Sequence, residues 1–290
     1  MSEAGQLGLL IWGMLLLRPY VFVFLCCYLW SASRHLGWRR TLTYLVSGYV
    51  IAWASEFSSI QTGFPYGYYI YIPATRQQEL WVAGVPFMDS LSYVFLTYAS
   101  YCLALLLQAG WRAGRRVAGP SAGGPAWATI LLGAVLFVTL DVVIDPLSLR
   151  GYRWFLGQIY GYPEYGLYFG IPLSNFAGWL VVGLVMITVL QRLARRSPGP
   201  AGLEHLPPAA ASAPYPGTVL YFGVLLFNLV MTFVIGEILL GFIATGIFLI
   251  LIGLAGAAWL QLKEQSRLRP EVKAGPTPVS DKVPRAGEIL

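Results

Sequence analysis

Long apolar segments alternate with short polar segments along most of the chain. Seven apolar segments come close to the roughly 20 residues that an α-helix needs to cross a membrane, and they span residues 7–30, 41–57, 85–108, 127–145, 168–191, 218–236 and 238–261. No basic stretch precedes the first segment and no small-residue cleavage site follows it, which favours a retained helix over a signal peptide. The pattern predicts an all-α integral membrane protein with about seven transmembrane helices.

Composition and charge agree with a membrane protein. Hydrophobic residues make up 57% of the 290 residues and charged residues 11%, whereas a soluble domain carries about a quarter charged residues. The 19 lysines and arginines follow the first, third, fifth and seventh predicted helices, except for Arg18, Arg76, Arg150 and Arg153. The positive-inside rule then predicts a protein of the cytoplasmic membrane with its N-terminus outside and its C-terminus in the cytoplasm. This asymmetry explains the net charge of +6 without a nucleic-acid partner.

Two stretches differ in composition from the apolar segments. Residues at about 197–217 are rich in proline and alanine, and residues 264–290 are polar and charged. Such compositions bury too little apolar surface to fold. The sequence therefore predicts one polytopic membrane domain over residues 1–263, with a disordered cytoplasmic linker inside it and a disordered cytoplasmic tail after it.

One short motif occurs twice. Gly84–Tyr93 aligns with Gly170–Trp179, and both begin with glycine, a β-branched residue and proline. Asp89 in the first copy matches Asn175 in the second. The motif predicts that helices 2–3 and 4–5 form a parallel structural repeat with a site at their interface. Chance similarity between two Gly-Pro helix starts is the alternative.

Four acidic residues are predicted near the outer ends of these helices, namely Glu56, Asp89, Asp141 and Asp145. Ionisable groups at membrane depth are costly and usually functional. Asp141 and Asp145 are four residues apart, so their Cβ atoms lie about 5–6 Å apart on one helix face. Two close carboxylates in a low dielectric do not ionise together readily, so one should hold a proton, as a general acid requires. We predict Asp141 as the acid and Asp145 as the residue that tunes it, although Asp145 can also be a plain helix-end residue before Pro146.

Glu56 has apolar neighbours and precedes a loop, broken by glycine and proline, that contains Tyr69 and Tyr71. An interfacial aromatic belt accounts for the tyrosines, but it accounts less well for a glutamate in apolar surroundings. We therefore predict Glu56 as a further catalytic carboxylate and the two tyrosines as substrate-binding residues.

Four more residues complete the predicted substrate site. Asp89 and Asn175 can cap the helices that they begin or direct polar groups into one cavity, and Trp179 follows Asn175 by one turn. Arg18 is predicted in the middle of the first helix, where an arginine is usually paired. It can hold one carboxylate ionised while another stays protonated; a kinked helix with a solvated arginine is the alternative.

The chain has two histidines, His35 and His205, both predicted on the basic side. A histidine-rich metal cluster cannot be built from them, which argues against the di-iron desaturases and hydroxylases. We predict a site without a metal.

Several ordered motifs across about residues 45–190 resemble the membrane-bound carotenoid biosynthesis family, which includes the carotenoid 1,2-hydratases of γ-carotene and bisanhydrobacterioruberin. The stretch Met88–Ser90, which follows Gly84–Pro86, is more polar than the corresponding segment of the family. This difference bears on which carotenoid end group the protein accepts. The motifs that carry the resemblance are Glu56, Thr62–Tyr71, Gly84–Pro86, Asp141, Asp145–Pro146, Trp154 and Tyr168–Trp179.

The resemblance implies addition of water to the terminal double bond of an acyclic carotenoid end group. An acid protonates the alkene, aromatic faces stabilise the tertiary cation, and a base, for which Glu56 is the candidate, deprotonates the attacking water. This chemistry implies no cofactor, a lipophilic carotenoid delivered by membrane lipid, and other carotenoid enzymes as candidate partners.

Three other functions fit parts of the pattern. A carotenoid cyclase begins with the same protonation, but an internal alkene traps the cation. A retinal photoreceptor needs a lysine within its last helix, and the first lysine of this chain, Lys263, is predicted at the end of that helix. A transporter or carotenoid-binding scaffold would show no turnover.

Overall fold

The computed structural model describes residues 3–114, 126–195 and 216–268. The predicted linker and tail lie mostly outside these ranges. At their edges, a helix already begins at Pro216 and another continues to Leu268.

Helices make up most of the described chain. Five of them are long and apolar enough to cross a membrane, and a sixth span results if the bent pair α1 and α2 is taken as one. α3 is of similar length but is not among the five, in keeping with its charged and hydroxyl side chains. The helices of the described residues are α1 (Glu3–Leu17), α2 (Pro19–Leu36), α3 (Trp38–Thr62), α4 (Phe87–Gly114), α5 (Ala126–Leu149), α6 (Leu173–Arg195), α8 (Pro216–Val234) and α9 (Ile238–Leu268).

The first predicted span is not one continuous helix. α1 and α2 meet at 89° around Arg18, whose backbone leaves the helical region. The physical cause is Pro19, which lacks an N–H donor and disfavours helical geometry in the residue before it. The prediction of a single helix over residues 7–30 was therefore wrong, and Arg18 lies at the break.

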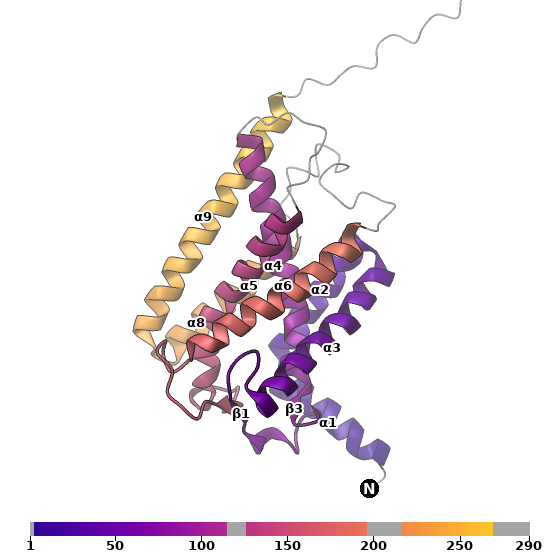
Figure 1. Cartoon of the computed structure of the whole chain (residues 1–290), viewed down its shortest axis with the longest axis vertical. Coiled ribbons are helices and arrows are strands. Elements are labelled where there is room, and N and C mark those ends of the chain that lie inside the picture. The colour runs from indigo at the N-terminus through magenta and orange to yellow at the C-terminus, as the bar shows by residue number, and fades with distance from the viewer. Residues whose placement is uncertain (1–2, 115–125, 196–215, 269–290) are drawn as a thin grey trace, which may run out of the picture.

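The bundle is organised around α4, which is buried along most of its length and packs against α3, α5, α8 and α9. Contact with α9 is especially close at Gly110, where an added Cβ would come within 2.3 Å of the Ala258 Cα. In Figure 1, α9 runs along the outside of the bundle, and α1 projects away from it.

Two small antiparallel sheets lie at one end of the bundle, the end at which α1 projects (Figure 1). β1 (Ile70–Tyr71) pairs with β4 (Tyr160–Gly161), so the loop after α3 contacts the loop after α5. β2 (Trp81–Val82) pairs with β3 (Val85–Pro86) directly before α4.

The two copies of the Gly-Pro motif have similar turns. In the first, Ala83 and Gly84 have φ values of 50° and 86°; in the second, Phe169 and Gly170 have 51° and 94°. Positive φ at two successive residues is the geometry of the two-residue type I′ hairpin turn. Each turn leads through a proline into a long helix, α4 in the first copy and α6 in the second.

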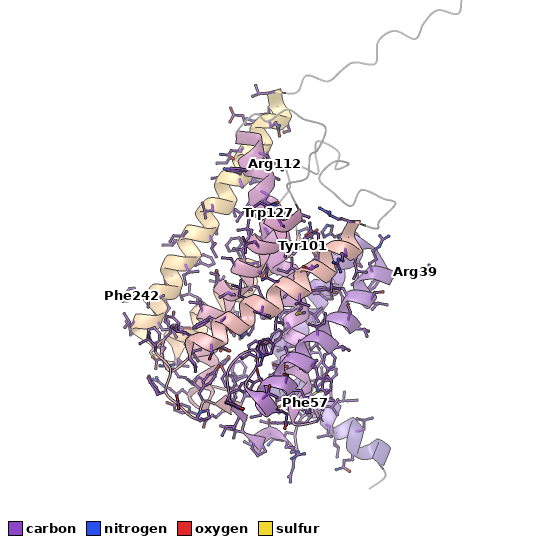
Figure 2. All side chains as sticks on the ribbon, in the orientation of Figure 1. Arg39, Phe57, Tyr101, Arg112, Trp127 and Phe242 are labelled. Atoms are coloured by element: carbon purple, nitrogen blue, oxygen red, sulfur yellow. The ribbon has the colours of Figure 1, made fainter. Side chains whose placement is uncertain are left out.

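Several basic residues lie at the other end of the bundle from the two sheets (Figure 2). Figure 2 shows Arg39 and Arg112 toward the opposite end from Phe57, which directly follows the candidate residue Glu56. Arg192 and Arg195 lie in the last turn of α6, and Arg267 lies in the last turn of α9.

Candidate active site

A cavity of about 940 Å³, counting open space at its mouth, brings together residues of six helices and the loops between them. One part of its wall carries acids, tyrosines and an amide, and another part is apolar. The polar part includes Glu56, Tyr69, Tyr71, Asp89, Asp145, Tyr160, Tyr162 and Asn175. The apolar part includes Val21, Phe24, Phe95, Leu96 and Val224.

Asp141 and Asp145 form a carboxylate pair near the end of α5, and Asn175 bridges them. The Asn175 Nδ2 donates to Asp141 Oδ2 at 2.9 Å and to Asp145 Oδ2 at 2.6 Å. Asp145 also accepts hydrogen bonds from the Tyr160 hydroxyl at 2.9 Å and the Tyr162 hydroxyl at 3.3 Å. A pair this close and this buried favours a single shared proton over two full charges.

The two members of the pair differ in their access to the cavity. Asp145 lines it, whereas Asp141 is not among the lining residues and is fully buried. Asp141 Oδ1 is buried and has no hydrogen-bond partner among the described residues. Asp141 therefore lies behind Asp145, on the side away from the cavity.

Glu56 is buried in α3 and lines the same cavity. Tyr71 donates to Glu56 Oε1 at 2.9 Å, and Ser90 donates to Glu56 Oε2. Each oxygen of the carboxylate thus accepts one hydrogen bond from the protein. Ser90 was not predicted as a site residue, although it directly follows Asp89 in sequence.

Arg18 contacts two carboxylates. Its Nε and Nη2 each lie 2.7 Å from an oxygen of Glu79, and its Nη1 lies 3.8 Å from Asp89 Oδ1. The side chains of Arg18 and Glu79 are 3% and 0% exposed, so this is a buried, bidentate ion pair. Sequence reasoning predicted a partner for Arg18 but missed Glu79, which lies in an aromatic-rich loop without a distinguishing motif.

The tyrosines that hold the carboxylates come from paired strands. Tyr71 lies opposite Tyr160 in the β1–β4 sheet. The sheet therefore sets the tyrosine that donates to Glu56 beside the tyrosine that donates to Asp145. Side chains two residues apart share a face of a strand, as Tyr160 and Tyr162 do where both contact Asp145. Tyr69 and Tyr71 have the same spacing, so the second tyrosine pair could have been found by it.

These tyrosines remain protonated donors. Burial raises the pKa of Tyr71 well above its ordinary value, and the negative charge of Glu56 raises this pKa further. Burial likewise raises the pKa of Tyr160, with an added contribution from Asp145. Both hydroxyls can therefore donate to a neighbouring carboxylate at any physiological pH.

Aromatic rings cover the wall beside the acids. Trp179 stacks on Tyr93 with ring centroids 4.6 Å apart, and Phe137 packs on Trp179 at the same distance. Tyr66 and Tyr69 continue this aromatic surface toward the strands. The predicted site residues Trp179, Asn175, Asp89, Arg18, Tyr69 and Tyr71 all line the cavity. Among the described residues, no cluster of three His, Cys, Asp or Glu side chains could hold a metal ion.

The fold and the cavity define an integral membrane protein with an acidic, aromatic-lined internal site. Residues 10–252 match the carotenoid biosynthesis protein family, and the chain belongs to that family. The chain is similar to bisanhydrobacterioruberin hydratase of Haloarcula japonica, with 29% identity over 149 residues. That match covers 51% of this chain and 44% of the relative, so the chain spans less than half of the relative's length. No solved structure matches the chain.

Proposed function

We propose that this protein hydrates the terminal double bond of an acyclic carotenoid end group to give a tertiary alcohol. The carrying observation is a cavity lined both by apolar side chains and by Asp145, one member of a buried carboxylate pair. Membership of the carotenoid biosynthesis family makes a carotenoid the substrate class. Similarity to a hydratase favours addition of water over other end-group reactions.

The proton comes from the Asp141–Asp145 pair. Asp145 delivers it, because Asp145 is the member of the pair that lines the cavity, and Asp141 holds the pair in its singly protonated state. These roles reverse the order that the sequence predicted. General acid catalysis of this kind contributes about 100-fold or more to a rate.

The reaction then proceeds through a tertiary cation. One alkene carbon takes the proton, the neighbouring carbon becomes cationic, and a water oxygen adds to that carbon and releases a proton. The faces of Trp179, Tyr93 and Tyr66 lie beside the acid pair. Ring faces attract a cation within about 6 Å, so this surface stabilises the intermediate.

The polyene lies along the apolar wall. Val21 and Phe24 of α2, Phe95 of α4 and Val224 of α8 supply this wall, and Tyr20 stacks on Phe227 beside it. An apolar wall that continues from a polar site is the arrangement expected for a long hydrocarbon with one reacting end.

We also propose that α3–α4 and α5–α6 are two copies of one parallel unit within a seven-span topology. The matched turns at residues 83–84 and 169–170 support the repeat. The basic residues at the far end of the bundle support a cytoplasmic location for that end, with the N-terminus outside. Reporter fusions at the ends of α4, α6 and α9 should all read cytoplasmic, and a periplasmic signal at any of them would contradict this orientation.

The proposed function is tested by expression in a host that produces lycopene, followed by mass spectrometry of the pigments. Hydration predicts a gain of one water for each reacted end, with the oxygen taken from isotopically labelled water. A ring-containing isomer of unchanged mass would instead indicate a cyclase. Unchanged pigment beside well-expressed, carotenoid-bound protein would indicate a binding protein, and either result would overturn the hydratase proposal.

A further inference from the structure

The cavity holds a carboxylate with surroundings unlike those of the acid pair. We infer that Asp89 is a catalytic base, which takes the proton from the water that attacks the cation. This inference rests on the proposed hydration and names a residue that the sequence analysis had placed only in substrate binding. Three features of the structure carry it.

The first feature is the cation beside Asp89. Arg18 Nη1 lies 3.8 Å from Asp89 Oδ1, while Nε and Nη2 of the same guanidinium are occupied by Glu79. A nearby positive charge favours the ionised form of a carboxylate, and the Glu79 carboxylate on the same guanidinium offsets part of that charge. The Asp141–Asp145 pair has an amide and two phenols as its hydrogen-bond partners, and none of these is a cation. A base must be ionised before it acts and an acid must be protonated, so the two surroundings suit opposite roles.

The second feature is the position of each carboxylate on its helix. Asp89 lies in the first turn of α4, where the helix dipole and the free N–H groups favour a negative charge. Asp145 lies near the C-terminal end of α5, where the dipole disfavours one. The dipoles therefore act in the same direction as Arg18: they favour a negative charge on Asp89 and disfavour one on Asp145.

The third feature is access to water. The Asp89 side chain is 20% exposed and lines the cavity, whereas Asp145 and Glu56 are buried. Both oxygens of Glu56 already accept hydrogen bonds from Tyr71 and Ser90. Within the described chain, the Asp89 carboxylate accepts no hydrogen bond from a protein side chain, and Arg18 Nη1 faces it only as an ion-pair partner at 3.8 Å. Asp89 is thus better placed than Glu56 to accept a proton from a water in the cavity.

The step balances in atoms and charge. Asp145 gives a proton to one alkene carbon, and the water oxygen bonds to the neighbouring cationic carbon. Asp89 takes one proton from that water as the C–O bond forms, which leaves the neutral alcohol. The proton then returns from Asp89 to the acid pair through water in the cavity, so no oxidant, reductant or metal is required.

Deuterium exchange separates the two roles. In deuterated water an active acid adds deuterium to the alkene, and the cation can revert by returning a proton, so recovered substrate becomes labelled. We expect Asp89→Asn to lose hydration by about 100-fold and to keep this exchange. We expect Asp145→Asn to lose both hydration and exchange. Glu164→Gln is the matched control, because it removes an exposed carboxylate outside the cavity and should behave as the parent.

Two further variants guard against a folding defect. Asp89→Ser also removes the carboxylate but keeps a small polar side chain in the first turn of α4, and Asp89→Glu keeps a base. Pigment that copurifies with each variant reports carotenoid binding. Restoration of hydration by glutamate, with exchange kept in asparagine and serine, would support the inference.

Two results would overturn it. One is hydration near the parent rate in both Asp89→Asn and Asp89→Ser. The other is loss of exchange together with hydration in both variants while carotenoid still binds. A parent protein that does not hydrate any end group would overturn the proposed function itself, which is a distinguishable failure.

Discussion

The polar part of the cavity has two sides, one from α3–α4 and one from α5–α6, which we call its two carboxylate walls. They are built from similar backbone, but different groups surround their carboxylates. On the α3–α4 side, Glu56 and Asp89 come with the cation Arg18. On the α5–α6 side, Asp141 and Asp145 come with the amide Asn175. Each wall has a tyrosine from the same small sheet on its carboxylate, Tyr71 or Tyr160.

The difference centres on one matched position. Asp89 and Asn175 occupy corresponding places after the Gly-Pro turn, and one carries a carboxyl group while the other donates hydrogen bonds. An amide at this position can hold two carboxylates around one proton, whereas a carboxylate must be balanced by a cation. A change of one side chain at a helix start thus gives two similar walls different partners for their carboxyl groups: Arg18 on one side and the Asn175 amide on the other.

The largest expected effect comes from removing the cation. Arg18→Leu leaves Glu79 buried without its partner, and loss of one member of a buried pair costs about 3–5 kcal/mol. Thermal unfolding in detergent measures this loss. Arg153→Leu is the control, because its ion pair with Glu237 is more exposed and should be worth under about 1 kcal/mol. Equal stability of the two variants would show that the buried pair does not hold the first wall together.

The next effect concerns proton delivery. Asp145→Asn should leave the protein folded and bound to carotenoid while turnover falls by about 100-fold or more. Asp141→Asn should reduce turnover less, since Asp141 does not line the cavity. Conversion of pigment per unit of purified protein measures both. A larger loss for Asp141→Asn would restore the order predicted from the sequence.

A third test makes the two walls alike. Asn175→Asp replaces the shared donor with a third carboxylate between Asp141 and Asp145, which lie 2.9 Å and 2.6 Å from its amide. We expect a loss of stability of about 1–3 kcal/mol, because buried acceptors lose their partner. The loss should shrink at low pH, where the added acid is protonated and can donate again. A stability loss independent of pH would contradict this account.

The smallest effect compares the two turns. Gly84 and Gly170 both have positive φ, so alanine at either position should cost about 1–2 kcal/mol from backbone strain. At Gly170 an added Cβ would also meet Leu149 at 2.9 Å, whereas at Gly84 the nearest atom lies at 3.7 Å. Gly170→Ala should therefore unfold at a lower temperature than Gly84→Ala. The reverse order would show that the contact with Leu149 does not decide which turn tolerates alanine better.

Most of the fold was predictable because its signal is local. Runs of apolar residues predicted the long helices, and the boundaries were close for α5 and α8, whereas α4 and α9 extend six and seven residues beyond their predicted ends. The break at Arg18 was considered only as a kink, because the hydrophobic pattern continues through Pro19 and gives no sign of an 89° bend. Spacing of four residues predicted that Asp141 and Asp145 share a helix face, and both contact Asn175.

The sequence by itself determined the membrane class, the carboxylate pair on α5, the aromatic loops and the doubled Gly-Pro motif. Tertiary structure alone decided that Arg18 pairs with Glu79, 61 residues away, and that Asp145 rather than Asp141 lines the cavity. It also decided that β1 pairs with β4 and brings the tyrosines of two loops to neighbouring carboxylates. The physical reason is that hydropathy and helical spacing depend on neighbouring residues, whereas access to a cavity and the pairing of buried charges depend on how distant segments pack.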